Sequence, residues 1–346
     1  MGRGYVRQET WEKLNRLDGD AHEEIQSAFS GILESIGSVV STLAKNLYTS
    51  HAQFVFELLQ NAEDNYFQRA EEQNQLRYVE FRMFHDRMVV DCNEDGFTEN
   101  NLRAICEVGK SSKIGSEGYI GEKGIGFKSV FMAAWKVHIQ SGDFSFSFQH
   151  RREESGLGMV TPIWENPSED VPPHLTRMTL YFHQTEDPQV SSTQRETIRQ
   201  QLKDLQGDIL LFMRKLQEIR ISIFDEEGND QYSAVLSASE IGLSRVTVKK
   251  AINEDGKSNS TTRTYHVTKH VAGNLAKNEN RNYSEYEETT KKYSTARVVL
   301  AFPLSSDSTP IIQPQKVFAF LPVDYRGFSR LCHAGEPARY RSDFGT

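Results

Sequence analysis

Residues Phe54 to Asp64 read F-V-F-E-L-L-Q-N-A-E-D, and residues Gly121 to Phe127 read G-E-K-G-I-G-F. Successive residues of an α-helix are rotated by about 100°, so Glu57, Asn61 and Asp64, at positions i, i+4 and i+7, share one stripe of the helix surface. The apolar residues between them fall on other sides of the helix. The first stretch therefore predicts a helix that packs in a layer and presents two acids and an amide to one site.

The second stretch closes a glycine-rich segment at the start of a predicted helix. Lys110 to Gly126 contains five glycines and few apolar residues, whereas Phe127 to Ala134 is apolar and compatible with a helix. The free N–H groups and the dipole at a helix N-terminus favour bound anions. We therefore expect a lid-like loop whose backbone can approach phosphate oxygens closely.

Two common glycine-loop templates do not fit this segment. A P-loop needs G-x-x-x-x-G-K-[ST], but Phe127 stands between Gly126 and the following Lys-Ser pair. The sequence G-K-S at 109–111 does not fit either, because Ala104 stands where the first glycine belongs. A Rossmann fingerprint needs G-x-G-x-x-G directly after the first strand, but here Ser129 stands at the last glycine and the segment lies far from the first predicted strand.

Length and composition indicate a globular chain with two lobes. The chain has 346 residues, 37% of them hydrophobic, and single cores tend to stop growing near about 250–300 residues. The net charge of -8 gives no electrostatic reason to expect a nucleic acid partner. We expect a first lobe over 1–225 and a β-rich extension over 226–346.

The sequence also favours an intracellular protein, cytoplasmic or nuclear. Met1 to Asp20 is polar, without the hydrophobic stretch of a secretion signal, and there is no long apolar run that would span a membrane. Cys92, Cys106 and Cys332 show no C-x-x-C spacing, which fits a reducing compartment. His266 and His270 lack a third metal ligand nearby, so we expect no metal site there.

Hydrophobic periodicity predicts both helices and strands in the first lobe. Helices are expected over 21–48, 52–70, 98–107, 127–134 and 193–218, and strands over 78–83, 88–91, 136–140, 144–148, 177–183 and 219–224. Further apolar runs after 225 predict more strands, around a polar insertion at about 274–294 that we expect to be mobile.

The order and spacing of these features resemble the GHKL ATPase superfamily, which includes gyrase B subunits, large heat-shock chaperones, histidine kinases and MutL proteins. This resemblance covers roughly residues 25–225. A closer likeness, to the ATP-binding domain of the sacsin and NO VEIN group, runs across nearly the whole chain. It is carried by A-I-C-E-V-G-K-S-S-K at 104–113, G-Y-I-G-E-K-G-I-G-F-K-S-V-F at 118–131, D-I-L-L-F-M-R-K-L at 208–216 and V-F-A-F-L-P-V at 317–323.

The resemblance implies an α+β fold, a two-layer α/β sandwich of Bergerat (GHKL) type. Its mixed, mostly antiparallel sheet would carry helices on one face, and the C-terminal β-rich lobe would be added to it. The implied ligands are ATP or ADP and Mg²⁺, held between the sheet and the helices under the glycine-rich lid.

Carried over residue by residue, the resemblance implies that Asn61 coordinates Mg²⁺, that Glu57 orients or deprotonates the attacking water, and that Asp64 lines the adenine and ribose side. A carboxylate beside a triphosphate has its pKa raised toward that of a useful base, and a neutral amide can bind a hard cation without adding repulsion.

The lid and one strand supply the other residues that the resemblance implies. The phosphates would be cradled by the backbone N–H groups of Gly121, Gly124, Ile125, Gly126 and Phe127, with Lys110, Lys123 and Lys128 as counter-charges. Thr176 occupies the place of a strand threonine that contacts adenine in GHKL proteins.

The chain departs from the family at the adenine aspartate. The pattern D-x-G-x-G, ending at Gly96, puts Cys92 where the aspartate belongs and Glu94 where the first glycine belongs. Asp91 could serve with a one-residue bulge, Asn93 could offer its side-chain carbonyl to the adenine amino group, or neither reads the base. Purine preference is therefore open.

The function expected from these features is Mg²⁺-dependent ATP binding, with slow hydrolysis that drives lid closure and a chaperone-like or regulatory switch acting on a protein client. One alternative is a scaffold that binds nucleotide without hydrolysing it, and another is a protein-interaction module with an inactive pocket. A histidine kinase would need a phosphoacceptor, and His22 lies in a polar stretch with no sign of a two-helix hairpin. The oligomeric state is open.

Overall fold

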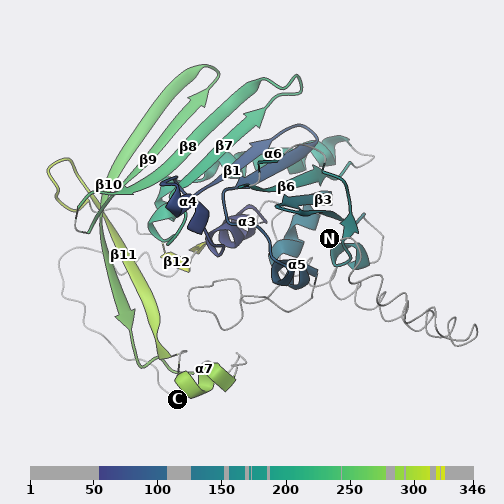
Figure 1. Cartoon of the computed structure of the whole chain (residues 1–346). Helices are drawn as coiled ribbons and strands as arrows, with labels where there is room; N and C mark the ends of the chain where they lie inside the picture. Colours follow the sequence, from purple (N-terminus) through teal and green to yellow (C-terminus); the bar gives the residue numbers. More distant parts are fainter. Residues whose placement is uncertain are drawn as a thin grey trace, which may run out of the picture.

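The structure is a computed structural model, and it describes residues 54–106, 126–151, 156–167, 171–172, 174–184, 188–242, 244–277, 285–291, 294–311, 317–319 and 321–323. The predicted helix over 21–48 and the glycine-rich segment up to residue 125 lie outside the described residues. Figure 1 shows a broad twisted sheet with short helices packed beneath it.

Apart from α6, which has 17 residues, the helical elements in the described residues have ten residues or fewer. They are α3 (Phe54–Glu63), α4 (Gln68–Glu72), α5 (Glu99–Cys106), η1 (Gly126–Met132), η2 (Gly156–Met159), α6 (Pro188–Asp204), η3 (Gly207–Leu211) and α7 (Glu285–Thr290).

The strands make up most of the described fold. They are β1 (Tyr78–Met83), β2 (Arg87–Cys92), β3 (Ala134–Ser141), β4 (Phe144–Gln149), β5 (Ile163–Trp164), β6 (Thr176–Phe182), β7 (Glu218–Phe224), β8 (Asp230–Glu240), β9 (Arg245–Glu254), β10 (Lys257–Ala272), β11 (Ala296–Leu304), β12 (Val317–Ala319) and β13 (Leu321–Val323).

The first eleven strands form one sheet in the order β11-β10-β9-β8-β7-β1-β2-β6-β3-β4-β5, and β12 pairs with β13. Strands β1 and β7 pair in parallel, whereas the neighbouring pairs β1–β2, β2–β6, β3–β6 and β7–β8 are antiparallel. The prediction of an α+β fold with a mixed, mostly antiparallel sheet is therefore confirmed.

One face of this sheet carries the core. In β1 the alternate residues Val79, Phe81 and Met83 are buried, and they share the main hydrophobic cluster with Phe146 and Phe148 of β4. Side chains from α3, η1, α6 and η3 belong to the same cluster. The strict alternation of the sequence therefore orients the sheet, because every second residue must face the helical layer.

The predicted boundary near 225 falls in the turn between β7 and β8, where the sheet continues. Strand β8 pairs along β7, and β9, β10 and β11 extend the same sheet outward. A second, smaller cluster of buried residues supports this extension: Leu211, Val248, Tyr265 and Val267. The β-rich extension is thus joined edge to edge to the first lobe.

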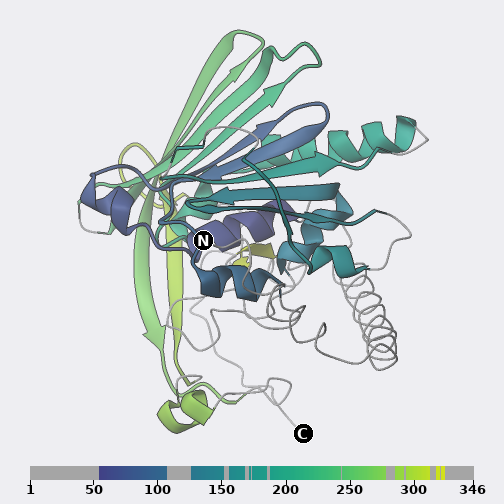
Figure 2. The same cartoon turned by 45° about the vertical axis from the view of Figure 1, so that its right-hand side comes forward.

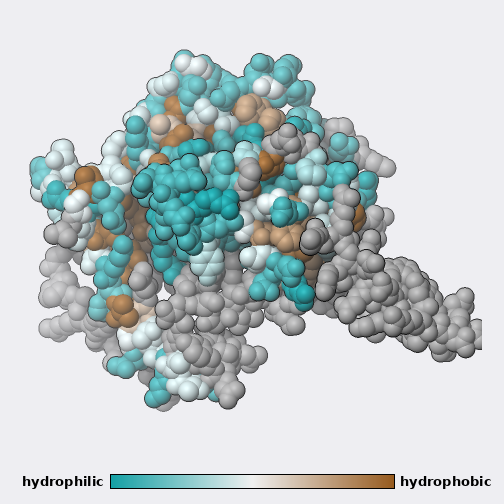
Figure 3. All heavy atoms as spheres, viewed as in Figure 1, coloured by the Kyte–Doolittle hydropathy of each residue, from teal (hydrophilic) through white to brown (hydrophobic). Residues whose placement is uncertain are grey.

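Strands β10 and β11 project from the sheet as a two-stranded ribbon with α7 at its tip, as both ribbon views show (Figures 1 and 2). The predicted polar insertion is therefore the connection between these two strands, and α7 lies within it. On the ribbon, Val298, Leu300 and Phe302 are exposed. In Figure 3 the surface around α4 is hydrophilic, and hydrophobic side chains form small separate patches.

Three predicted helices differ in the structure. The helix expected over 193–218 ends at Asp204, and Gln206 is extended. The chain then passes so close to β9 that a Cβ on Gly207 would lie 2.5 Å from Cγ1 of Val248. This close approach requires glycine and interrupts the helix.

The other two differences lie beside the site. The helix expected over 52–70 divides into α3 and α4, and Asp95 accepts the N–H groups of Gln68 and Arg69 at 2.9 Å each at the start of α4. The helix expected over 127–134 is the 3₁₀ segment η1, because β3 already begins at Ala134. Within the described residues, no helix is both long and apolar enough to cross a membrane.

Candidate functional site

Helix α3 supplies the predicted acid-amide stripe. Its apolar residues Phe54, Val55, Leu58, Leu59 and Ala62 are buried in the main core. Glu57 and Asn61 lie on the remaining surface and are half-buried. The helix therefore packs as the sequence predicts, with this stripe at the edge of the core.

The glutamate of the stripe touches the end of the glycine-rich segment. A Cβ built on Gly126, the first residue of η1, would lie 2.2 Å from Oε2 of Glu57 and 3.1 Å from its Cδ. Glycine leaves room for the carboxylate here, and a side chain at this position would require the end of Glu57 to move. The structure thus brings Glu57 and Gly126 together, although they are far apart in the sequence.

Most of the predicted phosphate-binding residues lie outside the described residues: Lys110, Gly121, Lys123, Gly124 and Ile125. Phe127 is buried beside Phe131 and Phe148, with ring centroids 6.4 and 6.0 Å away. Its side chain therefore fixes η1 to the core and leaves only its backbone available for a ligand.

Lys128 is buried rather than directed at a ligand. Its side chain is 2% exposed, and its Nζ donates hydrogen bonds to the main-chain carbonyls of Ile105 in α5 and Met159 in η2. The amine also lies 4.8 Å from the ring centroid of Phe148. Burial lowers the pKa of the Lys128 amine from 10.5 to about 7. In this conformation the Lys128 amine ties α5 to η2 and is directed into the core.

Asp64 lies just beyond the last helical residue. It is 1% exposed, and its backbone N–H donates to the carbonyl of Gln60 at 3.0 Å. The third member of the predicted stripe is therefore in the turn that leaves α3.

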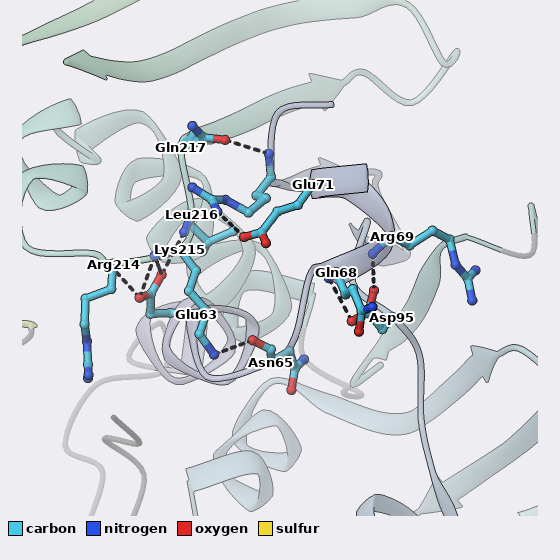
Figure 4. Close-up of polar contacts among 11 residues, drawn as sticks. Glu63, Asn65, Gln68, Arg69, Glu71, Asp95, Arg214, Lys215, Leu216 and Gln217 are labelled. Atoms are coloured by element: carbon cyan, nitrogen blue, oxygen red, sulfur yellow. Dashed lines mark hydrogen bonds and ion pairs between the residues drawn. The ribbon is translucent and has the colours of Figure 1, made fainter. Parts of the chain in front are cut away.

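Sequence reasoning missed the adjacent Glu63, which is 2% exposed at the end of α3. Its carboxylate accepts the backbone N–H groups of Arg214, Lys215 and Leu216 at 2.6 to 3.1 Å (Figure 4). Burial raises the pKa of this carboxyl, although the three N–H donors act to lower it. No local signal in the sequence indicates Glu63, because its hydrogen-bond partners lie about 150 residues away.

Asp91 belongs to the opposite face of the sheet. Its neighbours Val90 and Cys92 are in the main core, so the side chain between them faces the other way. Its carboxylate pairs with Arg82 Nη2 at 2.7 Å and with Arg177 Nε at 2.7 Å and Nη2 at 2.8 Å. The structure does not bring Asp91 together with the α3 stripe.

Asn93 uses both ends of its side-chain amide to hold the preceding chain. Its Oδ1 accepts the N–H of Tyr78 at 2.8 Å, and its Nδ2 donates to the carbonyl of Leu76 at 2.8 Å. The Asn93 amide, one of the candidates for contact with adenine, is thus hydrogen-bonded to the chain at the start of β1.

Thr176 and Gly96 both lie against the side chain of Ser141. The hydroxyls of Ser141 and Thr176 are 2.6 Å apart, and Ser141 Oγ accepts the N–H of Phe97 at 2.9 Å. Gly96 has φ +93°, and a Cβ there would lie 3.3 Å from Ser141 Oγ. The glycine therefore allows residues 93–96, which we call the acidic loop, to turn against β3.

Cys92 lies in the same row of the sheet. It pairs with Thr176, which pairs in turn with Ser141, so the three side chains share the helix-covered face. Burial raises the pKa of the Cys92 thiol well above its usual range. A neutral thiol, which is a weak hydrogen-bonding group, therefore stands where the family pattern has an aspartate.

The acidic loop connects this row to the end of α3. The N–H of Asp95 donates to the carbonyl of Tyr66 at 2.9 Å, and Gly96 follows it against β3. A series of contacts thus runs from Gly126 through Glu57 and α3 to Gly96 and Thr176.

Carboxylate and amide oxygens are suitable ligands for a hard cation. Among the described residues, no group of three or more His, Cys, Asp or Glu side chains is arranged to hold a metal ion. Mg²⁺ commonly takes most of its oxygen ligands from water and phosphate and only one or two from protein side chains.

Comparisons with known proteins agree with the resemblance found in the sequence. Residues 38–144 match the family model of the Sacsin domain. A segment covering 53% of the chain is 33% identical, over 192 residues, to Protein NO VEIN of Arabidopsis thaliana and spans 7% of that protein. A segment covering 44% of the chain is 29% identical, over 175 residues, to Chaperone protein HtpG of Anaplasma phagocytophilum (strain HZ) and spans 27% of it. The chain therefore matches only a small part of each relative's length.

Proposed function

Because this chain carries a sacsin and NO VEIN-like domain of GHKL type, we propose that it binds ATP with Mg²⁺ between α3 and the sheet, in a Bergerat-type arrangement. The single observation that carries the proposal is the contact between the Glu57 carboxylate and Gly126. It joins the acid-amide helix to the end of the glycine-rich segment, as a shared triphosphate site requires.

The roles of the α3 residues follow from their chemistry. Asn61 lies one helical turn beyond Glu57, so its neutral amide oxygen can share with a phosphate the coordination of Mg²⁺. Glu57 is half-buried, and a water held by its carboxylate would approach the terminal phosphate from the helix side. When bound, Mg²⁺ would neutralise phosphate charge and polarise the bond that breaks.

Backbone groups suit the phosphate side of the site. Gly126 begins η1, and N–H groups at the start of a helical turn attract anions. The described lysine of this region, Lys128, is directed into the core, so we assign phosphate neutralisation to Mg²⁺, the backbone, and Lys110 and Lys123 of the lid.

On the base side we retain Thr176 and drop Asp91 and Asn93. The hydroxyl of Thr176 lies on the helix-covered face beside Ser141, whereas Asp91 pairs with arginines on the other face and Asn93 holds the chain before β1. The neutral Cys92 thiol offers a weaker partner for an adenine amino group than a carboxylate would. We therefore propose that the site binds the triphosphate but discriminates only weakly among bases.

ATP would act as a conformational ligand, in a chaperone-like or regulatory role toward a protein client. Contacts of the lid with the terminal phosphate would exist with ATP and be lost with ADP, which gives the two states different free energies. The relative named as a chaperone supports such a role.

Binding and hydrolysis are tested separately with Glu57→Ala. We expect Mg-ATP affinity to stay within about threefold of the parent chain and phosphate release to fall by about a hundredfold. Glu196→Ala, which removes an exposed helical glutamate on α6, is the matched control. Equal phosphate release from the parent and Glu57→Ala would leave a non-hydrolysing nucleotide-binding protein as the better description.

A further inference from the structure

The last turn of α3 is fastened to the segment before β7 by two reciprocal contacts. In one direction, the Glu63 carboxylate binds three consecutive N–H groups, of Arg214, Lys215 and Leu216. In the other, Lys215 Nζ donates to the carbonyl of Asn65 at 2.5 Å, beyond the helix end (Figure 4). We call this pair of contacts the Glu63–Lys215 clasp.

Additional contacts give the clasp a defined geometry. Lys215 Nζ also lies 3.4 Å from the carbonyl oxygen of Asp64 and 5.0 Å from the centroid of the Tyr66 ring. Oε1 and Oε2 of Glu63 each accept two of the N–H contacts, so the carboxylate cannot rotate without losing some of them. These contacts therefore fix the end of α3 relative to residues 214–216.

Burial of the Glu63 carboxylate carries a desolvation cost, and the three N–H groups that it accepts offset this cost. An apolar side chain in its place would leave these three N–H groups without that acceptor. A shift of the end of α3 relative to 214–216 would break these contacts, so they favour one position of the helix end. The position of α3 in turn determines where the Glu57 carboxylate lies relative to Gly126.

The clasp lies between the proposed nucleotide site and the extension. Glu57, in contact with Gly126, is about 9 Å from Glu63 along the helix axis. On the other side the clasped segment enters β7, and Gln217 and Glu218 both donate backbone N–H groups to the carbonyl of Arg77, at 2.9 and 3.2 Å. Strand β7 is the one on which β8 and the rest of the extension are built.

We propose that the Glu63–Lys215 clasp positions α3 so that Glu57 reaches Gly126, and that it couples the nucleotide state of this site to β7 and β8. The coupling rests on the proposed ATP binding, whereas the positioning of α3 does not. Glu63 and Lys215 are positioning residues, since neither touches Gly126.

Hydrogen exchange without nucleotide tests the positioning. Lys215→Met keeps the aliphatic stem and removes the donor, and we expect about tenfold faster exchange in 54–63 and 126–132 as well as in 212–217. Lys215→Arg should restore slow exchange in all three. Glu63→Gln should act like Lys215→Met, and Lys215→Met decides the matter if Glu63→Gln does not fold.

Arg214→Met is the matched control. It removes a positive charge from the same segment, but its side chain is exposed and its backbone N–H still reaches Glu63. Faster exchange confined to 212–217 in Lys215→Met, or an equal effect of Arg214→Met, would overturn the positioning role.

A second arm with saturating Mg-ATP tests the coupling. In the parent chain we expect slower exchange in 126–132 and in 218–240, and in Lys215→Met slower exchange in 126–132 alone. An equal response of 218–240 in both chains would overturn the coupling. If Mg-ATP slows exchange nowhere in the parent chain, the proposed ATP binding fails and the coupling with it, while the comparison without nucleotide still decides the positioning role.

Discussion

The carboxylate of Glu57 lies so close to Gly126 that a side chain on that glycine would overlap it, with 2.2 Å between Oε2 and the Cβ position. This contact joins the acid-amide helix α3 to the first residue of η1. The absence of a side chain at Gly126 leaves room for the Glu57 carboxylate in this position.

Gly126→Ala should displace the Glu57 carboxylate. Because the overlapping atoms are the end of a flexible side chain, we expect the free energy of unfolding to fall by only about 1 kcal/mol or less. If Glu57 holds the attacking water as we propose, its displacement should slow ATP turnover by about tenfold or more. Urea unfolding and phosphate-release assays measure the two effects.

Gly273→Ala is the control for this substitution, because a Cβ there meets nothing within 4 Å. Unchanged turnover in a Gly126→Ala chain that hydrolyses ATP would show that the position of Glu57 is unimportant for the reaction.

Lys128 predicts a particular dependence of stability on pH. Burial lowers the pKa of its amine from 10.5 to about 7, so between these values the unfolded chain binds a proton that the folded chain does not. The free energy of unfolding should therefore rise with pH across this window, by at most roughly 1.4 kcal/mol per pH unit from this group.

Lys128→Met should remove this part of the rise. Urea midpoints at several pH values between about 7 and 10 measure it, with Lys249→Met as the control because that lysine is exposed. The same dependence on pH in Lys128→Met and the parent chain would show that the amine is not buried in solution.

Asp91→Asn separates a structural role from a ligand-binding role. The Asp91 side chain is 4% exposed and is paired with two arginines, so loss of its charge should lower the free energy of unfolding by about 2–4 kcal/mol. Asp86→Asn, in the same hairpin but 50% exposed, should change it by no more than about 0.5 kcal/mol.

In the folded fraction of Asp91→Asn we expect unchanged affinity for Mg-ATP, because the side chain faces away from α3. Isothermal titration below the unfolding temperature measures this affinity. A large loss of affinity with little loss of stability would return Asp91 to the adenine site.

Alternation and helical periodicity predicted the elements that build the core. The strands over 78–83, 144–148 and 219–224 were found because each places apolar residues on one face only. Strand β10 carries no such signal over 257–263, where every residue is polar and exposed, and its existence depends on pairing with β9. The sheet order is likewise set by contacts between residues distant in the sequence.

The candidate site was predictable where local spacing determines it. Spacing put Glu57 and Asn61 on one helix face, and Gly126 at the start of a helical turn. It could not reveal that Asp91 pairs with Arg177, because these two residues lie 86 positions apart in the sequence. Lys128 was assigned from its closeness to the glycines, although the apolar run Val130 to Ala134 beside it was a signal of burial.

The most direct test of the central claim is a calorimetric titration of ATP and ADP into the parent chain and Asn61→Ala, each with and without Mg²⁺. We expect Mg²⁺ to strengthen ATP binding to the parent chain by about tenfold or more, and to have little effect on Asn61→Ala. Gln200→Ala, an exposed helical amide on α6, should behave as the parent chain. No binding of ATP to the parent chain, or equal Mg²⁺-dependent affinity in Asn61→Ala, would contradict a nucleotide site between α3 and the glycine-rich segment.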